Sequence, residues 1–244
     1  MTLEKNNSDA SNDKSLAYPT CHKCNGINYC TVGRASKILD NCPMKIYPEV
    51  QKKARELYEN DEFVKKSTGI ASIVEATGYI HWPRLKDTVE YAKGMGYTKL
   101  GIAFCVGLLK EAKKIAEILE KYGFDIISVC CKTGGVKKEA VGVPKEFTMF
   151  SKTGYTIGWI TCNPASQALL LNKVKTDMNI IVGLCVGHDI TFTHLSEAPV
   201  TTLIAKDRSM PHNPAGVLFA HYGKEFFSRE FKELRGIEVK KKSS

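Results

Sequence analysis

The sequence lacks the features of membrane and secreted proteins. No apolar run approaches the length of about 20 residues that a membrane helix requires. The start, Met1–Asp9, is polar and carries no signal peptide. We therefore expect a cytoplasmic protein with no membrane contact, kept in a reducing compartment.

Common catalytic signatures are absent as well. The chain has no P-loop, no Gly-x-Gly-x-x-Gly after an expected strand, no nucleophile-elbow serine and no His-Glu-x-x-His. It also lacks the interleaved aromatic and basic residues of single-strand binders. The enzyme classes marked by these motifs are excluded, and whether the chain is an enzyme stays open.

The charge is basic without forming one patch. The formal net charge is +9, which would suit an acidic partner such as nucleic acid. However, the lysines are scattered over expected helix faces, and metal-bound thiolates would offset several positive charges. Only Lys240–Lys242 forms a run, and we expect it to be a solvated tail. Charge is therefore weak support for nucleic-acid binding.

The cysteine content points to metal or redox chemistry. The chain has nine cysteines among 244 residues. An odd number in a reducing compartment favours metal ligands or redox groups over a disulfide framework.

Changes in composition and periodicity divide the chain into five expected parts. These are a disordered lead-in (1–17), a cysteine-rich metal-binding segment (18–48), a helical connector (49–96), an α/β domain (97–235) and a basic tail (236–244). In the connector, apolar spacing predicts helices over 49–66 and 69–80 and a third from Pro83 to the glycines at 94–96.

The α/β domain is predicted from short apolar runs that alternate with helices. Four expected strands (100–105, 125–131, 179–185 and 201–205) are joined by segments that include helices over 108–122 and 163–175. Continuous apolar strands separated by helices indicate a parallel sheet covered on both faces. We expect a doubly wound, mostly parallel fold of the Rossmann or flavodoxin-like type. Asn163-Pro164 and Asn213-Pro214 are each expected to cap and begin a helix.

The first cysteine group has the spacing of a metal site. Cys21, Cys24, Cys30 and Cys42 place four soft ligands within 22 residues, and Pro43 follows the last of them. Thiolates select zinc or iron–sulfur clusters. One tight Cys-x2-Cys pair and a final Cys-Pro favour a [4Fe–4S] cluster, and a structural zinc is the alternative.

The second group depends on the fold. Cys105, Cys131 and Cys185 each end an expected strand, and Cys162 precedes an expected helix at the same edge. Ligands bind at that edge of open α/β sheets, so four thiols are expected to converge there on a second cofactor. Cys130 and Cys131 are adjacent; alternation along the strand buries one of them, and we favour Cys131 as the ligand.

Polar residues beside these cysteines are further candidates. His188 and Asp189 follow Cys185 and are the candidate catalytic pair: His188 would complete a metal shell or move a proton, and Asp189 would orient it or cap the helix. His212 is another candidate, and Asp207-Arg208 would bind an anion or form a surface ion pair.

Several strings resemble the DUF1847 family. They are Gly101–Cys105, Ser128–Lys132, Cys162–Pro164, Val182–Asp189 and Ala198–Leu203. The resemblance covers about residues 20–220 and implies an uncharacterised metal-binding protein of anaerobic bacteria and archaea. Both cysteine groups are then expected family features. After Pro214 the chain reads Ala-Gly-Val-Leu, where some relatives are expected to carry another cysteine.

These observations predict an iron–sulfur protein with a redox or sulfur-handling role, using one or two clusters. Its partner would be an electron-transfer protein or a small sulfur-containing substrate, and its reaction that of an oxidoreductase or a sulfur-transfer or desulfidase-type enzyme. The alternative is a zinc-stapled, non-enzymatic module that binds an acidic partner such as nucleic acid. The oligomeric state has no signal in the sequence.

Overall fold

The structure is a computed structural model that describes residues 18–24, 30, 38–147, 156–221 and 223–228. The chain forms two compact units, Met1–Gly69 and Ile70–Ser244, and each is described here by itself. The expected lead-in at 1–17 and the basic tail at 236–244 lie outside the described residues.

The described part of the first unit is helical. It contains a 3-10 turn, η1 (Cys21–Lys23), then α2 (Pro43–Ile46), α3 (Pro48–Asn60) and the start of α4 (Glu62–Gly78). The expectation of one helix over 49–66 is wrong. Asp61 is extended, and its carboxylate accepts a hydrogen bond of 2.9 Å from the Val64 N–H, as an N-cap does. The chain therefore starts a new helix where the apolar spacing predicted continuity.

The second unit is built on a four-stranded sheet. Its strands are β1 (Lys99–Phe104), β2 (Asp125–Cys130), β3 (Met178–Val182) and β4 (Val200–Ile204). They run in the order β2-β1-β3-β4, and every pairing is parallel. The predicted doubly wound α/β fold is confirmed.

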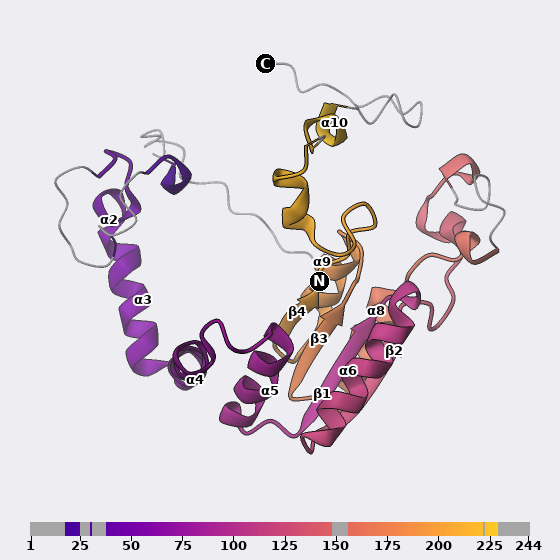
Figure 1. Cartoon of the computed structure of the whole chain (residues 1–244), viewed down its shortest axis with the longest axis horizontal. Coiled ribbons are helices and arrows are strands. Elements are labelled where there is room, and N and C mark those ends of the chain that lie inside the picture. The colour runs from indigo at the N-terminus through magenta and orange to yellow at the C-terminus, as the bar shows by residue number, and fades with distance from the viewer. Residues whose placement is uncertain (1–17, 25–29, 31–37, 148–155, 222, 229–244) are drawn as a thin grey trace, which may run out of the picture. The chain divides into compact units, whose positions relative to one another are not determined.

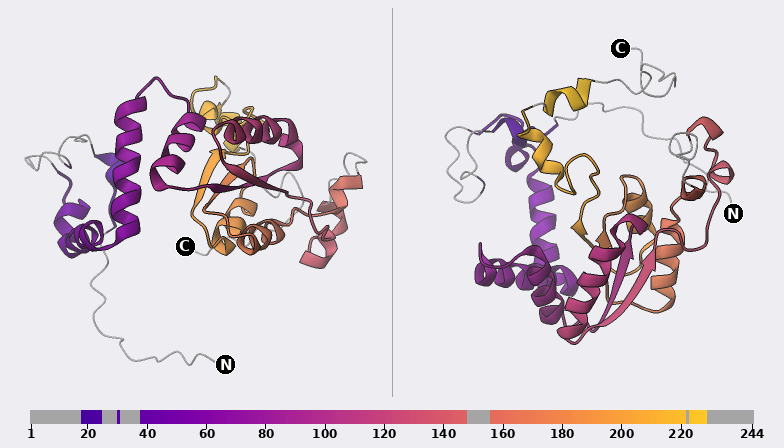
Figure 2. Two further views of the ribbon diagram at one scale, coloured as in Figure 1. Left: turned by 90° about the horizontal axis from the view of Figure 1, so that it is seen from below. Right: turned by 45° about the vertical axis from the view of Figure 1, so that its right-hand side comes forward.

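Helices cover both faces of this sheet. α5 (Arg84–Met95) precedes β1, α6 (Leu109–Lys121) joins β1 to β2, α8 (Pro164–Lys173) precedes β3, and α9 (His188–Leu195) joins β3 to β4. α6 lies on one face, and α8 and α9 lie together on the other (Figures 1 and 2). The remaining described elements are short: 3-10 turns at Val106–Leu108, Lys138–Val141, Lys145–Phe147, Thr156–Trp159 and Pro214–Leu218, and α10 (Gly223–Ser228).

Only one of the two expected Asn-Pro caps forms. The Asn163 side chain accepts a hydrogen bond of 3.0 Å from the Ser166 N–H and caps α8. Asn213 makes no such bond, because Pro214–Leu218 is a 3-10 turn closed through the backbone, with the Gly216 N–H donating to the Asn213 carbonyl at 2.9 Å.

The core of the second unit lies between the sheet and these helices. Leu100, Ile102 and Ile180 on the central strands are fully buried. One buried polar group, Asn179, is satisfied by side chains: its Oδ1 accepts from Thr176 Oγ1 and its Nδ2 donates to Ser196 Oγ, both at 2.8 Å. Within the described residues, no helix combines the length and apolar character needed to cross a lipid bilayer.

Candidate thiolate site

The main chain brings four cysteines of the second group to the carboxyl edge of the sheet. Cys105 directly follows β1, and its N–H donates to the Val182 carbonyl at the end of β3 (3.1 Å). The Cys131 N–H donates to the Phe104 carbonyl (2.8 Å), and the Cys131 carbonyl accepts from the Asn163 N–H (2.7 Å). These bonds tie the ends of three strands and the start of α8 together.

The side chains form a continuous polar chain. The Cys131 thiol is hydrogen-bonded to the sulfurs of Cys105 and Cys162. The His188 imidazole lies next to Cys162 and Cys185 and interacts electrostatically with both sulfurs. Cys131 is fully buried and Cys105 nearly so, whereas Cys162 and Cys185 are half-buried. Cys130 is half-buried and packs against the hydrophobic core, as Cys162 also does.

Nitrogen donors from elsewhere point at three of these sulfurs. The Val106 N–H donates to Cys131 Sγ at 3.3 Å. Two cations that follow β4 reach across the edge: Lys206 Nζ lies 3.4 Å from Cys105 Sγ, and Arg208 Nη2 lies 3.2 Å from Cys185 Sγ. Donors of this kind stabilise a thiolate over a thiol.

Two of the four edge sulfurs are strongly acidic. The pKa of Cys105 falls to about 5, mainly through the hydrogen bond from Cys131, against the opposing effect of burial. The Gly107 N–H and Lys206 lower it further. The pKa of Cys162 falls to about 4, again mainly through Cys131, with His188 and Lys132 adding to the effect. Both groups are thiolates at neutral pH.

The partner groups shift in the opposite sense. The pKa of Cys131 is raised because its proton bridges to Cys105 and Cys162, so Cys131 stays a thiol between two thiolates. Hydrogen bonds to Cys162 and Cys185 raise the pKa of His188 to about 10, so its imidazole is protonated at neutral pH. The pKa of Cys185 is lowered, chiefly by the hydrogen bond to His188 and then by Arg208.

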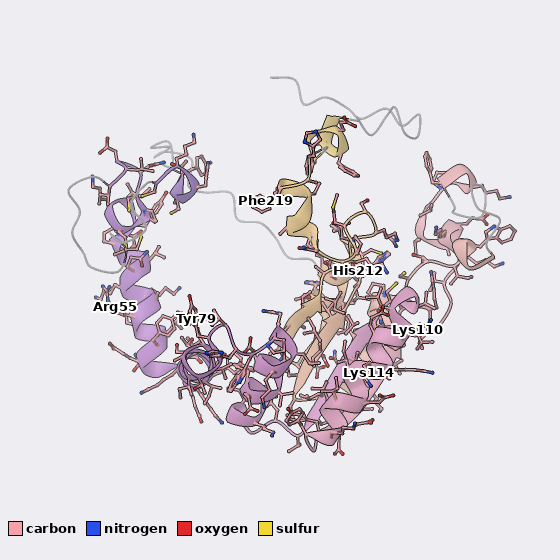
Figure 3. All side chains as sticks on the ribbon, viewed as in Figure 1. Arg55, Tyr79, Lys110, Lys114, His212 and Phe219 are labelled. Carbon is pink, nitrogen blue, oxygen red and sulfur yellow. The ribbon has the colours of Figure 1, made fainter. Side chains whose placement is uncertain are left out.

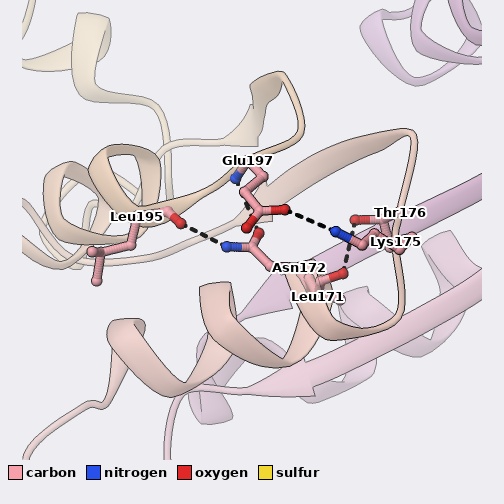
Figure 4. Close-up of polar contacts among 6 residues, drawn as sticks. All are labelled: Leu171, Asn172, Lys175, Thr176, Leu195 and Glu197. Carbon is pink, nitrogen blue, oxygen red and sulfur yellow. Dashed lines mark hydrogen bonds and ion pairs between the residues drawn. The ribbon is translucent and has the colours of Figure 1, made fainter.

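The helices that present Cys162 and His188 are locked together at their far ends (Figure 4). Asn172 at the end of α8 donates to the Leu195 carbonyl of α9 at 2.8 Å, and its Oδ1 accepts from the Glu197 N–H at 3.0 Å. Lys175 Nζ lies 3.3 Å from the Glu197 carboxylate. This link fixes α8 and α9 as a pair, so the groups that their amino ends position keep a constant spacing.

The loop that follows β4 positions Arg208 at the site. The Asp207 carboxylate accepts from the N–H groups of Ser209 and Met210, both at 2.9 Å, and the Asp207 N–H donates to His212 Nδ1 at 3.2 Å. His212, labelled in Figure 3, has a left-handed backbone (φ 61°). Asp207 and His212 thus shape the loop, while the Arg208 guanidinium binds a thiolate.

Asp189 lies beside the site with a local role. Its Oδ1 accepts from the N–H groups of Gly187 (3.0 Å) and Ile190 (2.8 Å). Gly187, not Asp189, is the N-cap residue of α9. The hydrogen bonds of the Asp189 carboxylate therefore go to the backbone at the start of the helix and not to His188.

The donor types at this site suit a soft metal, but the described side chains are not arranged around a metal-binding position. Four sulfurs and an imidazole are soft or borderline ligands. Across the described residues, the only buried side-chain nitrogen or oxygen atoms without a partner are His188 Nδ1 and Gln167 Oε1, and His188 belongs to this cluster. However, no group of three or more His, Cys, Asp or Glu side chains in that part of the chain is arranged to hold a metal ion as it stands. Binding would require rotation of these side chains.

The first cysteine group is only partly described. Cys21 and Cys24 flank a single turn, with the Cys24 N–H donating to the Cys21 carbonyl at 3.0 Å. Asn41 Nδ2 donates to the Tyr18 carbonyl (2.7 Å) and to Thr20 Oγ1 (3.0 Å), which brings the stretch before Cys42 next to the stretch before Cys21. Cys30 is exposed, and its neighbours at 25–29 and 31–37 lie outside the described residues.

Comparison with known proteins assigns the chain to a family. The model of a family described as a protein of unknown function, DUF1847, matches residues 42–203. This chain belongs to the DUF1847 family. The matched span contains all four edge cysteines and His188 but ends before Lys206 and Arg208. No solved structure matches the chain.

A relative of this DUF1847 protein comes from Methanocaldococcus jannaschii. It is the uncharacterized protein MJ0455, which is 40% identical over 202 residues. The aligned region covers 83% of this chain and 94% of the relative. The similarity thus extends over nearly the whole of a second protein.

Three residues of the site could not be singled out from the sequence. In the sequence, Lys132 and Lys206 resemble any other surface lysine, and only the fold brings them to the thiolates. Gln167 is fully buried, and its Nε2 donates to the carbonyls of Phe104 (3.2 Å) and Val129 (2.7 Å). The sequence carries no signal for Gln167, because its burial follows only from the fold.

Proposed function

We propose that this chain is an iron–sulfur protein with a redox or sulfur-handling role, acting in the reducing cytoplasm. A cluster would be held at the sheet edge by Cys105, Cys131, Cys162 and Cys185, with His188 beside it as a proton donor, and a second cluster by the N-terminal cysteines. The cluster would supply electron transfer or an iron site for a sulfur-containing substrate.

One observation carries the proposal: three of the four edge sulfurs (Cys105, Cys131 and Cys185) receive nitrogen donors, and two of the four (Cys105 and Cys162) have pKa values well below neutral pH. The thiolate is the form that binds metal. Hydrogen bonds to sulfur also tune the potential of a cluster. The four edge cysteines form no disulfide, which leaves each available as a ligand.

The residues of this chain have defined tasks in such a site. Lys206 and Arg208 neutralise thiolate charge and would attract an anionic or thiol-bearing substrate. His188 is protonated between two sulfurs, so it is the group placed to deliver a proton there.

The test is metal and sulfide analysis of protein purified without oxygen. We expect brown protein, broad absorption at about 400 nm and about four irons per cluster. The double variant Cys162→Ser, Cys185→Ser should lose the iron of the cluster at the sheet edge. Cys130→Ser, which alters a core-packed cysteine next to Cys131, should keep that iron. Colourless protein with one zinc after anaerobic reconstitution would overturn the proposal.

The competing function is the zinc-stapled module for an acidic partner, which the net charge of +9 favours. It predicts binding to nucleic acid that weakens steeply with salt. Measuring affinity for single- and double-stranded DNA at two salt concentrations separates the two functions.

A further inference from the structure

A cavity lies at the opposite end of the strands from the cysteines. Its volume is about 530 Å³, and it opens between the α4–α5 segment and the first residues of β3 and β4. Met178, Val200 and Thr201 contribute its sheet side. Small-molecule sites have volumes of about 300–1,000 Å³, so the cavity has the size of a ligand site.

Specific contacts build the walls of this cavity. Arg84 Nε donates to the Thr202 carbonyl at 3.0 Å and Arg84 Nη2 to Thr201 Oγ1 at 3.3 Å, which pins the start of α5 to the edge strand. The Trp82 indole packs directly on Gly78, where an added Cβ would lie only 2.3 Å from its Cε3 atom. The cavity is therefore fixed by packing and is more than a gap between side chains.

The turn at the rim is held in a costly conformation. Ile80 has a left-handed backbone (φ 56°), although it is β-branched and 85% exposed. Left-handed geometry in such a residue persists only where the surrounding structure imposes it, and it concentrates at ligand sites and switches. The turn places Ile80 and the exposed Tyr79, labelled in Figure 3, on the rim of the cavity.

The charges of the lining oppose the charge of the whole chain. Two carboxylates, Glu75 and Asp87, line the cavity, and in the described structure neither accepts a hydrogen bond or an ion pair. The single basic residue of the lining, Arg84, uses two donors on β4. The lining thus carries a formal charge of −1 in a chain of net charge +9, and its two carboxylates are the charged groups left to pair with a ligand.

We propose that this cavity binds a small organic cation, an ammonium or amidinium group carried on an aromatic or aliphatic body. Glu75 and Asp87 would pair with the cationic group, and the aromatic rings of Tyr79, Trp82 and Tyr91 would contact the body and add cation–π attraction. The site is separate from the thiolate site, so either can fail without the other.

The experiment uses two probes of similar size and opposite charge on the full chain. Phenethylamine and phenylacetate are titrated by calorimetry and by saturation-transfer NMR. We expect phenethylamine to bind at least about tenfold more tightly than phenylacetate, and its binding to weaken as salt is added. Equal or tighter binding of phenylacetate, or no binding of either at millimolar concentration, overturns the proposal.

Variants locate the binding. Glu75→Gln combined with Asp87→Asn should weaken phenethylamine binding at least about tenfold and lower the melting temperature only slightly, because neither carboxylate has a side-chain partner to lose and Asp87 loses only its attraction to the amino end of α5. The matched control is Glu117→Gln on α6, which removes an exposed carboxylate outside the cavity lining and should leave binding unchanged. Full retention of binding in the double variant, or equal loss in the control, also overturns the proposal.

Discussion

The acidity of Cys162 should be visible in its alkylation rate. With a pKa of about 4, this side chain is a thiol in only about one molecule in a thousand at pH 7. Because the thiolate is the nucleophile, its reaction with iodoacetamide should be nearly independent of pH between 6 and 8. A free thiol such as glutathione, with an ordinary pKa of about 8.5, should react about tenfold faster for each pH unit over the same range.

The perturbation is His188→Gln, which removes the positive charge hydrogen-bonded to this sulfur. Loss of an adjacent opposite charge moves a pKa by about 1–3 units, here upward. The alkylation midpoint of Cys162 should therefore rise by that amount, while the hydrogen bond from Cys131 keeps it below that of a free thiol.

The assay is mass spectrometry of the Cys162 peptide after timed alkylation of metal-free protein under argon. Lys114→Gln on α6, labelled in Figure 3, is the matched control, since it removes the same charge from an exposed position and should not move the midpoint. A tenfold rise per pH unit in the unmodified protein, or an unchanged midpoint in His188→Gln, would refute the thiolate–imidazolium pair.

Three other predictions concern stability. Gly101→Ala should lower the free energy of unfolding by about 2–5 kcal/mol in thermal melts, because the new Cβ would lie 2.0 Å from Asn179 Oδ1 and disturb its buried bonds; an unchanged melting temperature would contradict this packing. Ile80→Gly should raise that free energy by about 0.5–1 kcal/mol, since relief of left-handed strain exceeds the entropy cost of glycine; destabilisation would contradict the strained turn. Because the Cys162 pKa is depressed to about 4, its contribution to stability grows as pH rises from about 4 to about 9; because the His188 pKa is raised to about 10, its contribution is lost as pH rises from about 6.5 to about 10. The two effects cancel between about 6.5 and about 9, so the pair should make stability rise with pH from about 4 to about 6.5 and fall from about 9 to about 10. Urea titrations at several pH values test this, and stability unaffected by His188→Gln across that range would count against it.

The sheet was predictable because its signals are local. Four apolar runs separated by helical segments indicate parallel strands whichever way the rest of the chain folds, and the four observed strands fall within three residues of the predicted bounds. The parallel topology then places Cys105, Cys131 and Cys185 at one edge, since each follows the apolar run directly.

Other features depend on contacts between distant segments. Lys206 lies 101 residues from Cys105 in the sequence, and Arg84 lies 118 residues from Thr202. No local pattern distinguishes such cations from solvated ones. The break at Asp61 was missed for a different reason: the apolar spacing is compatible with one helix, and the interruption rests on a single side chain binding the Val64 N–H.

The bond between Arg84 and β4 also bears on how copies of this protein behave at high concentration. β4 is the last strand of its sheet, and a strand in that position offers unpaired main-chain groups to any other extended chain. The Arg84 guanidinium donates a hydrogen bond to the Thr202 carbonyl on this edge, so that carbonyl is not available to another strand. A charged side chain placed there disfavours strand-to-strand association between molecules, so the residue that helps to shape a cavity also guards against aggregation.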